Sequence, residues 1–427
     1  MKKYFLFIFL LAQSLLSVSQ DIDYARQLID TLSSPSFDGR GYVNGGDRKA
    51  FEYIAGQFSA IGLKPFGRDY FQSYTFPMNS LPGKVEASIN GKPLQAGVQF
   101  QVWAATPSIK GKFKLVTLKG KDLTDPTRFS RLTSKDYSGK FVFIDKKGIT
   151  DKVILARLDS LRFANVGHAK GLIFVSDQKL SWSVMIGYQP RNYTVLDIRR
   201  ESLPKKPREI ELDIESRFEK EHPARNVIGY IPGKLQPDSF LVFTAHYDHL
   251  GRMGSQVLYP GANDNASGTA MVLDLARHYS QSENRPYYSM VFICLSGEEA
   301  GLNGSTYCAE HPPFPLKNVK FLMNIDMVGT GSEGITMVNA TIFKDAYQRM
   351  VKINADNEYI MTVKERGESC NSDHCPFYKK GVPAVFIYSM GKEFTEYHNP
   401  EDRSSLLPLN EYKDIFRLVR DFVDGMR

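Results

Sequence analysis

The sequence predicts an α/β protein with a mixed, mostly parallel sheet flanked by helices and a largely β domain inserted into it. Two observations support this prediction. From residue 226 onward, apolar strand-like runs alternate with helical patterns, as an open α/β sheet requires. Before that region, residues 98–220 lack the alternation and consist of short β-rich runs, turns and basic linkers. The 427-residue length also accommodates more than one unit of about 150 residues.

The amino terminus has the layout of a secretory signal peptide. Two lysines precede an apolar run of about fifteen residues, and small residues follow around Ser17 and Ser19. We expect residues 1–19 to be removed and the mature protein to be exported, either periplasmic or secreted. A retained membrane anchor is disfavoured, because the run is short for a bilayer span of about 20 residues.

After the predicted signal peptide, two helices are expected around a glycine-rich loop. The helical spacing of Phe51, Ile54 and Phe58 indicates the second of them. The three segments, in order, are IDYARQLIDTLSS, FDGRGYVNGG and DRKAFEYIAGQFSAIGL. We expect residues 20–97 to join residues 221–427 in one α/β domain, with residues 98–220 as the insert.

Within the predicted insert, β-rich runs point to strands, and in the second half strands and helices alternate. The last helix carries Ile415, Phe416, Val419 and Phe422 on one stripe. The predicted strands of the insert are KFKLVTL, GKFVFID and GLIFVSD, and those of the second half are NVIGYI, SFLVFTAHYDHL, YSMVFICL, VKFLMNIDMVG and VPAVFIYS.

Charge and cysteine content exclude some classes of function. Loss of Lys2 and Lys3 takes the formal net charge from +7 to +5, and no basic block is present. We therefore expect no nucleic-acid partner and, after signal cleavage, no stable membrane association. The cysteines, four in number, are too few for a disulfide scaffold. Cys370 and Cys375 are close enough to pair, and two free thiols fit the sequence nearly as well.

Carboxylates and histidines gather where predicted strands of the second half end. Because the carboxyl ends of parallel strands share one edge of a sheet, these groups should converge. Carboxylates crowded together would repel one another unless cations neutralised them. The segments concerned are AHYDHLG, PGANDNASG, SGEEAG, NIDMVG and EYHNPED.

A pair of divalent ions matches this set of side chains. Zinc accepts imidazole and carboxylate together, and a two-metal hydrolase needs about one of each per ion plus a bridging carboxylate. We expect one bridging water or hydroxide, and with hydroxide the cluster of two divalent ions and three carboxylates is formally neutral, which lowers the cost of burying it. We assign His246 and Asp326 to one zinc, Glu299 and His398 to the other, and Asp264 to the bridge.

The adjacent glutamates of SGEEAG then take different roles. Glu299 binds an ion, and Glu298 stays unligated as the general base, ionised because of the nearby cations. Along the strand, Asp248 should point the same way as His246 and accept a hydrogen bond from its second ring nitrogen. His249 should then point away from the site.

These motifs resemble the secreted two-zinc aminopeptidases of the zinc exopeptidase clan, a family that includes leucyl aminopeptidases, aminopeptidase Y and plasma glutamate carboxypeptidase-like enzymes. The resemblance covers roughly residues 24–97 and 224–427, and the residues 98–220 resemble a protease-associated domain. Its marks are FDGRG, KAFEYIAGQFSAIGLKP, RNVIGYIPG, AHYDHLG, GANDNASGTA, SGEEAGLNGS, NIDMVG, SDHCPFYKKGVPA and EYHNPED, with DYSGKFVFID and HAKGLIFVSD in the insert.

The resemblance implies a zinc-exopeptidase fold and hydrolysis of the amino-terminal residue of peptides. It implies the same ligand set, a cis peptide after Asp264, and a hydrogen bond from Tyr397 to the developing oxyanion. Asp373 and His374 resemble groups that lie behind the ligands or beside the substrate rather than ligands.

Two other enzyme activities occur on similar proteins. Glutaminyl cyclases resemble DGEEA and ATDSA at the key loops, whereas this chain has SGEEAGLNGS and ANDNASG, which favours a peptidase. A carboxypeptidase of the glutamate carboxypeptidase type would need an arginine cluster, which linear sequence cannot reveal. A non-catalytic binding role is disfavoured, because all five predicted ligands and Glu298 are present.

Overall fold

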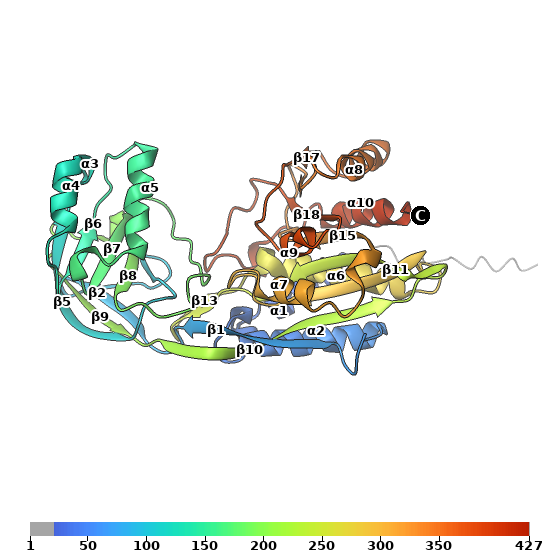
Figure 1. Cartoon of the computed structure of the whole chain (residues 1–427), viewed down its shortest axis with the longest axis horizontal. Helices are drawn as coiled ribbons and strands as arrows, with labels where there is room; N and C mark the ends of the chain where they lie inside the picture. Colours follow the sequence, from blue (N-terminus) through green and yellow to red (C-terminus); the bar gives the residue numbers. More distant parts are fainter. Residues whose placement is uncertain (1–20, 427) are drawn as a thin grey trace, which may run out of the picture.

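The structure is a computed structural model that describes residues 21–426. The predicted signal peptide, residues 1–19, lies outside the described residues. Within the part that is described, no helix is both long and apolar enough to cross a membrane. Figure 1 shows two bodies joined along the long strands β1 and β10.

The first body is built on an eight-stranded sheet in the order β1-β10-β14-β11-β15-β18-β16-β17. Its centre, from β14 to β18, is parallel, and β10 and β16 pair with it in the antiparallel direction. The predicted mixed, mostly parallel sheet is therefore confirmed. Its strands are β1 Phe71–Ser80, β10 Arg217–Ile231, β11 Gln236–His246, β14 Tyr288–Leu295, β15 Val319–Ile325, β16 Ile335–Val338, β17 Val363–Glu365 and β18 Ala384–Ser389.

Helices cover both faces of this sheet because each presents an apolar stripe to it. On one face, the Phe243 and Phe292 rings stack at 5.7 Å inside a large apolar core, which also contains the predicted buried stripe of the last helix. The helices of that face are α1 Ile22–Leu32, α2 Gly46–Ile61, α6 Gly268–Ser280 and α10 Tyr412–Asp424, with α8 Lys344–Asn357 packed on α10. The opposite face is covered by α7 Asn303–Glu310 and α9 His374–Lys379.

The second body is a separate eight-stranded sheet in the order β3-β2-β9-β5-β6-β7-β8-β4. It contains β2 Val85–Ile89, β3 Lys92–Leu94, β4 Phe100–Val102, β5 Ile109–Leu118, β6 Phe141–Ile144, β7 Gly171–Ser176, β8 Thr194–Arg199 and β9 Glu209–Ile214, with helices α3 Gly120–Thr124, α4 Pro126–Thr133 and α5 Lys152–Ser160. Its strands thus begin before the predicted insert boundary at residue 98, and β10 runs unbroken through residue 220. The assignment of residues 98–220 as a domain stays a prediction.

Short elements complete the chain. A two-stranded ribbon joins β12 Gly251–Met253 and β13 Val257–Tyr259. The short helical turns are η1 Pro35–Arg40, η2 Leu161–Phe163, η3 Val166–His168, η4 Arg200–Ser202, the π-type η5 Ala262–Ser267, η6 Leu316–Asn318 and η7 Ser404–Leu406.

A buried ion pair links α2 to β10 near the joint between the two bodies. The Nε2 atom of His222 lies 2.6 Å from Asp47 Oδ2, and its Nδ1 atom lies 3.0 Å from Glu219 Oε2. Burial alone would lower the pKa of His222, but the hydrogen bonds and charges of Asp47 and Glu219 raise it above its ordinary value. Protonated His222 therefore stabilises the folded chain.

We predict that this pair makes stability depend on pH. Because the folded pKa of His222 is raised, its contribution should be complete below the unfolded value of about 6.5 and lost as pH rises through the folded pKa. The replacement His222→Gln should lower the free energy of unfolding by about 1.5–3 kcal/mol at acidic pH and by less at alkaline pH. Denaturant unfolding at several pH values measures this, with the exposed His311→Gln as control. An equal loss at every pH would contradict it.

Candidate metal centre and active site

The parallel strands deliver three of the predicted site segments to one edge of the first sheet. His246 is the last residue of β11, and Asp326 directly follows β15. Glu298 and Glu299 lie in the turn after β14. All three strands run parallel side by side, so their carboxyl ends meet there.

The other two predicted ligands come from loops. Asp264 lies in η5, immediately before α6, and its peptide bond to Asn265 is cis, as the sequence resemblance implied. The carboxylate of Asp402 accepts the Asn263 and Asp264 backbone N–H groups at 2.7 and 3.0 Å. His398 lies in the loop before η7.

The five side chains meet around Asp264. Its Oδ1 atom lies 3.4 Å from His246 Nε2, and its Oδ2 atom lies 3.1 Å from His398 Nε2. His246 Nε2 is also 3.3 Å from Asp326 Oδ1, and His398 Nε2 is 3.2 Å from Glu299 Oε2. Asp264 therefore stands between two pairs, each made of one imidazole and one carboxylate.

Burial and charge make this cluster chemically unusual. The five predicted ligand residues are almost fully buried, with at most 9% of any residue exposed. Burial would raise the pKa of Asp264, yet hydrogen bonds from His246 and His398 hold it well below its ordinary value. Burial would also raise the pKa of Glu299, but the charge of His398 opposes this and the pKa is lowered to about 2. The carboxylates of Asp264 and Glu299 are thus kept ionised in a buried space.

This donor set fits divalent cations. Ligand atoms of His246, Asp264 and Asp326 all lie within 4.8 Å of one another, as do those of His249, Asp264 and Glu299. Buried carboxylates are stable only when paired or bound to metal, and imidazole nitrogen with carboxylate oxygen is a common divalent-metal environment. The cluster can thus hold two ions that share Asp264.

Two sequence predictions about the AHYDHLG segment are wrong. His246 Nδ1 lies 3.1 Å from the backbone oxygen of Asp248 but 3.8 Å from its carboxylate. His249 does not point away, because its Nδ1 lies 2.8 Å from Glu299 Oε1 in the buried site. Both predictions assumed two-residue alternation, which ends with β11 at His246.

The Asp248 carboxylate instead holds the paired glutamates. It accepts the backbone N–H groups of Glu298 and Glu299, each at 3.2 Å, and the Tyr42 hydroxyl at 2.6 Å. Asp248 therefore fixes the turn after β14, and its position behind the ligands agrees with the sequence expectation although its partners differ.

Glu298 and Glu299 differ in burial and in the direction of their pKa shifts. The side chain of Glu298 is partly exposed, whereas that of Glu299 is buried. Burial and the charges of Asp373 and Glu299 raise the pKa of Glu298 well above its ordinary value, and the His246 charge opposes this. The protein groups alone therefore favour a protonated Glu298, and bound cations would be needed to keep it ionised as predicted.

Comparison with known proteins finds a family match for part of the chain. Residues 226–423, here called the M28 segment, match the model of peptidase family M28. This segment, which is less than half of the chain, is therefore similar to that family. The match contains every predicted ligand and Glu298, so the metal centre described above lies wholly within the M28 segment.

Curated relatives are similar to parts of the chain. Aminopeptidase YwaD of Bacillus subtilis is 32% identical over 195 residues, which are 42% of this chain and 39% of that protein. A probable zinc metalloprotease of Pyricularia oryzae is 38% identical over 113 residues, 26% of this chain and 22% of that protein. The chain thus matches less than half the length of these relatives.

The fold is similar over nearly the whole chain. The zinc aminopeptidase BSAP from Bacillus subtilis has a TM-score of 0.69 at 20% identity, covering 95% of this chain and 94% of that one. An aminopeptidase from Aneurinibacillus sp. strain AM-1 has a TM-score of 0.66 at 20% identity, with the same coverage. These similarities show that the chain shares the fold of both structures beyond residues 226–423.

The remaining predicted residues surround the ligands of the M28 segment. The Tyr397 ring stacks on that of His398 at 3.9 Å and remains 47% exposed. Burial raises the pKa of Tyr397, so its hydroxyl stays protonated. Asp373 is fully buried, and burial raises its pKa to about 7. Burial lowers the pKa of His374 to about 4, and its Nε2 atom donates to the Ser369 carbonyl at 2.8 Å.

Sequence reasoning missed a hydrogen-bonded chain behind Asp326. The Thr244 hydroxyl donates to Asn324 Oδ1 at 2.7 Å, and Asn324 Nδ2 donates to Ser372 Oγ at 2.9 Å. The Ser372 hydroxyl then donates to Asp326 Oδ2 at 2.8 Å. Because Asn324 Nδ2 donates to Ser372 Oγ, the Ser372 hydroxyl proton is free to point at Asp326. This hydrogen bond orients the Asp326 carboxylate.

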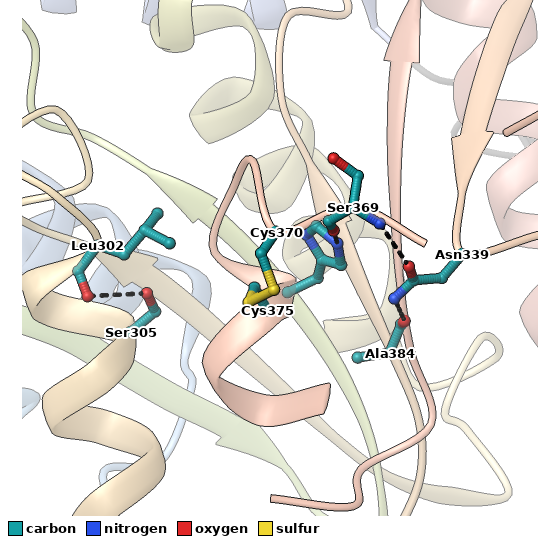
Figure 2. The surroundings of a disulfide bond; sticks show 8 residues. Leu302, Ser305, Asn339, Ser369, Cys370, Cys375 and Ala384 are labelled. Atoms are coloured by element: carbon teal, nitrogen blue, oxygen red, sulfur yellow. Dashed lines mark hydrogen bonds between the residues drawn. A yellow bond between two sulfur atoms is a disulfide. The ribbon is translucent and has the colours of Figure 1, made fainter. Parts of the chain in front are cut away.

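A disulfide closes the loop that carries Ser372. Cys370 and Cys375 are bonded, which settles the choice that the sequence left open, and Figure 2 shows the bond beside Ser369 and the start of α9. Asn339 also contacts this loop, accepting the Ser369 backbone N–H at 3.3 Å. The only sequence signal for Ser372 was its position between two closely spaced cysteines.

Arg40, outside the M28 segment, holds the backbone of its ligand loops. This fully buried guanidinium donates to the Tyr247, Pro260 and Gly261 carbonyls at 2.6–2.7 Å, and to Leu32 and Asp264 at 3.0 and 3.2 Å. Burial lowers its pKa to about 10, so it stays charged at neutral pH. The FDGRG motif therefore ties the amino-terminal segment to the metal centre.

We predict that Arg40→Lys destabilises the protein. A lysine ammonium is a point charge without the planar fork, so it cannot reach these carbonyls together. The free energy of unfolding should fall by about 3 kcal/mol or more, because several buried charge-assisted bonds are lost. Denaturant unfolding measures the change. The control is Arg26→Lys, since the partly exposed Arg26 also donates to backbone carbonyls. Equal small losses in both variants would contradict the prediction.

Proposed function

We propose that this protein is a zinc-dependent aminopeptidase that hydrolyses the amino-terminal peptide bond of peptides and holds two zinc ions. The observation that carries the proposal is the position of Asp264, with one carboxylate oxygen facing His246 and the other facing His398. A bridging carboxylate between two imidazole–carboxylate pairs suits a two-metal hydrolase. The similar Bacillus subtilis proteins named as an aminopeptidase and a zinc aminopeptidase support the same activity.

His246 and Asp326 would hold one zinc ion, Glu299 and His398 the other, and Asp264 both. Bound zinc supplies Lewis acidity, which lowers the pKa of a water molecule and polarises a peptide carbonyl. We assign His249 to orient Glu299 through Nδ1, because that atom faces Oε1 while Oε2 faces His398.

Proton transfer falls to Glu298. As the attacking water adds to the scissile carbonyl carbon, Glu298 takes its proton, and when the C–N bond breaks it returns that proton to the leaving amine. The backbone hydrogen bond from Glu298 to Asp248 holds the residue at the site during both transfers. We assign the exposed, protonated Tyr397 hydroxyl to donate to the oxygen that gains charge.

Two further expectations accompany this function. We infer that the protein is exported with residues 1–19 as its signal, and that residues 98–220 form a protease-associated-like domain beside the candidate metal centre. Detection of the protein in the periplasm or medium, with Gln20 as its first residue, tests the first of these. The substrate is a peptide, and the side-chain preference at the cleaved residue is a matter for assay.

The activity is tested with a substrate panel. Metal-depleted protein should be inactive and should regain activity with zinc. Amino-acid amides and dipeptides should be cleaved, and peptides with an acetylated amino terminus should not. Release of pyroglutamate from amino-terminal glutamine peptides as the main activity would instead show a cyclase, and cleavage of acetylated dipeptides would show a carboxypeptidase.

We predict that Glu298→Gln separates binding from catalysis. The amide keeps the shape of the side chain but cannot accept a proton, so kcat should fall by about 10³-fold. Zinc content, measured by atomic emission, should equal that of the wild type, because Glu298 is not a ligand. Glu310→Gln, on the exposed surface of nearby α7, is the matched control. Near-full activity of Glu298→Gln would show that the base is another group.

A further inference from the structure

A loop of the second sheet reaches the candidate metal centre. Residues 177–193, here called the insert loop, connect β7 with β8, which are neighbouring strands of that sheet. Although β7 and β8 belong to the second body, the loop between them contacts the residues around His398 and Glu299. It is therefore the part of the insert that can influence the site directly.

The first contact is made by main-chain atoms of Trp182. Its N–H donates to the His398 carbonyl at 2.9 Å, and its own carbonyl lies 2.7 Å from His398 Nδ1. Because a carbonyl can only accept, the Nδ1 atom of His398 carries a proton. In the neutral ring this leaves the lone pair on Nε2, the atom that faces Asp264 and Glu299.

The second contact is made by Tyr188. Its hydroxyl donates to the carbonyl of Ala300, the residue after Glu299, and accepts the Asn303 side-chain amide at 3.2 Å. The insert loop thus holds the turn that carries Glu299 as well as the ring of His398. A third link is the ion pair between Lys179 and Glu396, two residues before His398.

The insert loop is itself firmly anchored at Trp182. The indole N–H donates to the Val102 carbonyl of β4 at 2.7 Å, and the ring packs on Tyr259 at 4.9 Å. Only 3% of Trp182 is exposed. The carbonyl that orients His398 is therefore fixed by a buried side chain rather than by a flexible loop.

The other half of the centre has different support. The carboxylate of Asp326 is oriented by Ser372, and Ser372 by Asn324, all within the first sheet and the disulfide loop. The Nδ1 atom of His246 faces the carbonyl of Asp248 in its own segment. None of these supporting groups comes from the insert loop.

We propose that the insert loop is a positioning element for one of the two ion sites, the site formed by Asp264, Glu299 and His398. This inference rests on the proposed two-zinc function. It makes the insert a structural part of the metal centre, so that disturbing the loop selectively weakens one ion. Removing the partner behind a ligand typically lowers metal affinity by about 10–100-fold.

Zinc titration calorimetry on the metal-depleted full chain tests the proposal. The wild type should bind two zinc ions. Trp182→Ala frees the main chain that contacts His398, and one zinc affinity should fall by about 10–100-fold while the other is unchanged. Tyr188→Phe, which removes only a hydroxyl, should weaken the same ion by about fivefold.

Three further variants locate the effect. In Tyr193→Phe the lost hydroxyl contacts Arg162 within the insert, so both affinities should match the wild type. Ser372→Ala should weaken the ion that Trp182→Ala leaves unchanged. In a His398→Ala background, Trp182→Ala should cause little further loss, because its effect passes through that ring. Fluorescence of the remaining tryptophan, Trp103, reports whether the insert stays folded.

The outcomes separate this inference from the proposed function. A wild type that binds no zinc contradicts the function itself. A wild type with two ions, together with Trp182→Ala and Tyr188→Phe variants that keep both affinities, overturns the inference and leaves the function standing. An equal loss of affinity for both zinc ions in Trp182→Ala also overturns the inference, because a loop that positions one ion site should change the affinity of that site alone.

Discussion

The arrangement of this protein depends on one electrostatic constraint, the burial of three carboxylates in which Asp326 and Glu299 both lie within coordinating reach of Asp264. Asp264 lies at the centre, and each of its oxygens faces a different imidazole. Charges held out of water are costly unless they are paired, hydrogen-bonded or bound to cations. The surrounding structure therefore has to hold these side chains rigidly if bound cations are to offset that cost.

The sheet alone provides only part of this rigidity. Parallel strands place His246, Asp326 and the Glu299 turn at one edge, but Asp264 and His398 lie on loops. Asp402 fixes the backbone beside Asp264 through two N–H groups, and the buried guanidinium of Arg40 gathers the surrounding carbonyls. Loops would otherwise be mobile and exposed, so these partners make them as well defined as the strand ends.

Sequence patterns predict most of this architecture because they report burial and chain direction. Alternating apolar strands and helices predicted the mixed sheet, and the convergence of strand ends accounts for the meeting of His246, Asp326 and the Glu299 turn. The sequence expectation that Asp264 and His398 also follow strands of this sheet was wrong, because both lie on loops. The rule failed just beyond β11. His249 and Asp248 follow the last strand residue, where two-residue alternation no longer holds, so their partners could not be derived.

Other parts of the site have no readable signal in a sequence. Arg40 donates to backbone carbonyls, which every residue has. The FDGRG motif therefore does not indicate which carbonyls Arg40 contacts. Ser372 matters through an ordered chain of donors that only the folded structure aligns. The start of the second sheet was also not readable, because β3 joins that sheet by pairing with β2, and β2 pairs with β9, which is distant in sequence.

The insert loop shows why the two bodies cannot be treated as independent modules. If the second sheet only limited access to the candidate metal centre, we would expect it to contact the first body through surface side chains. Instead the main chain of Trp182 exchanges two hydrogen bonds with His398, and Trp182 is anchored within the insert. A ligand whose ring orientation depends on another body couples the two. Movement of the insert relative to the first sheet would then alter the geometry of the metal centre as well as access to it.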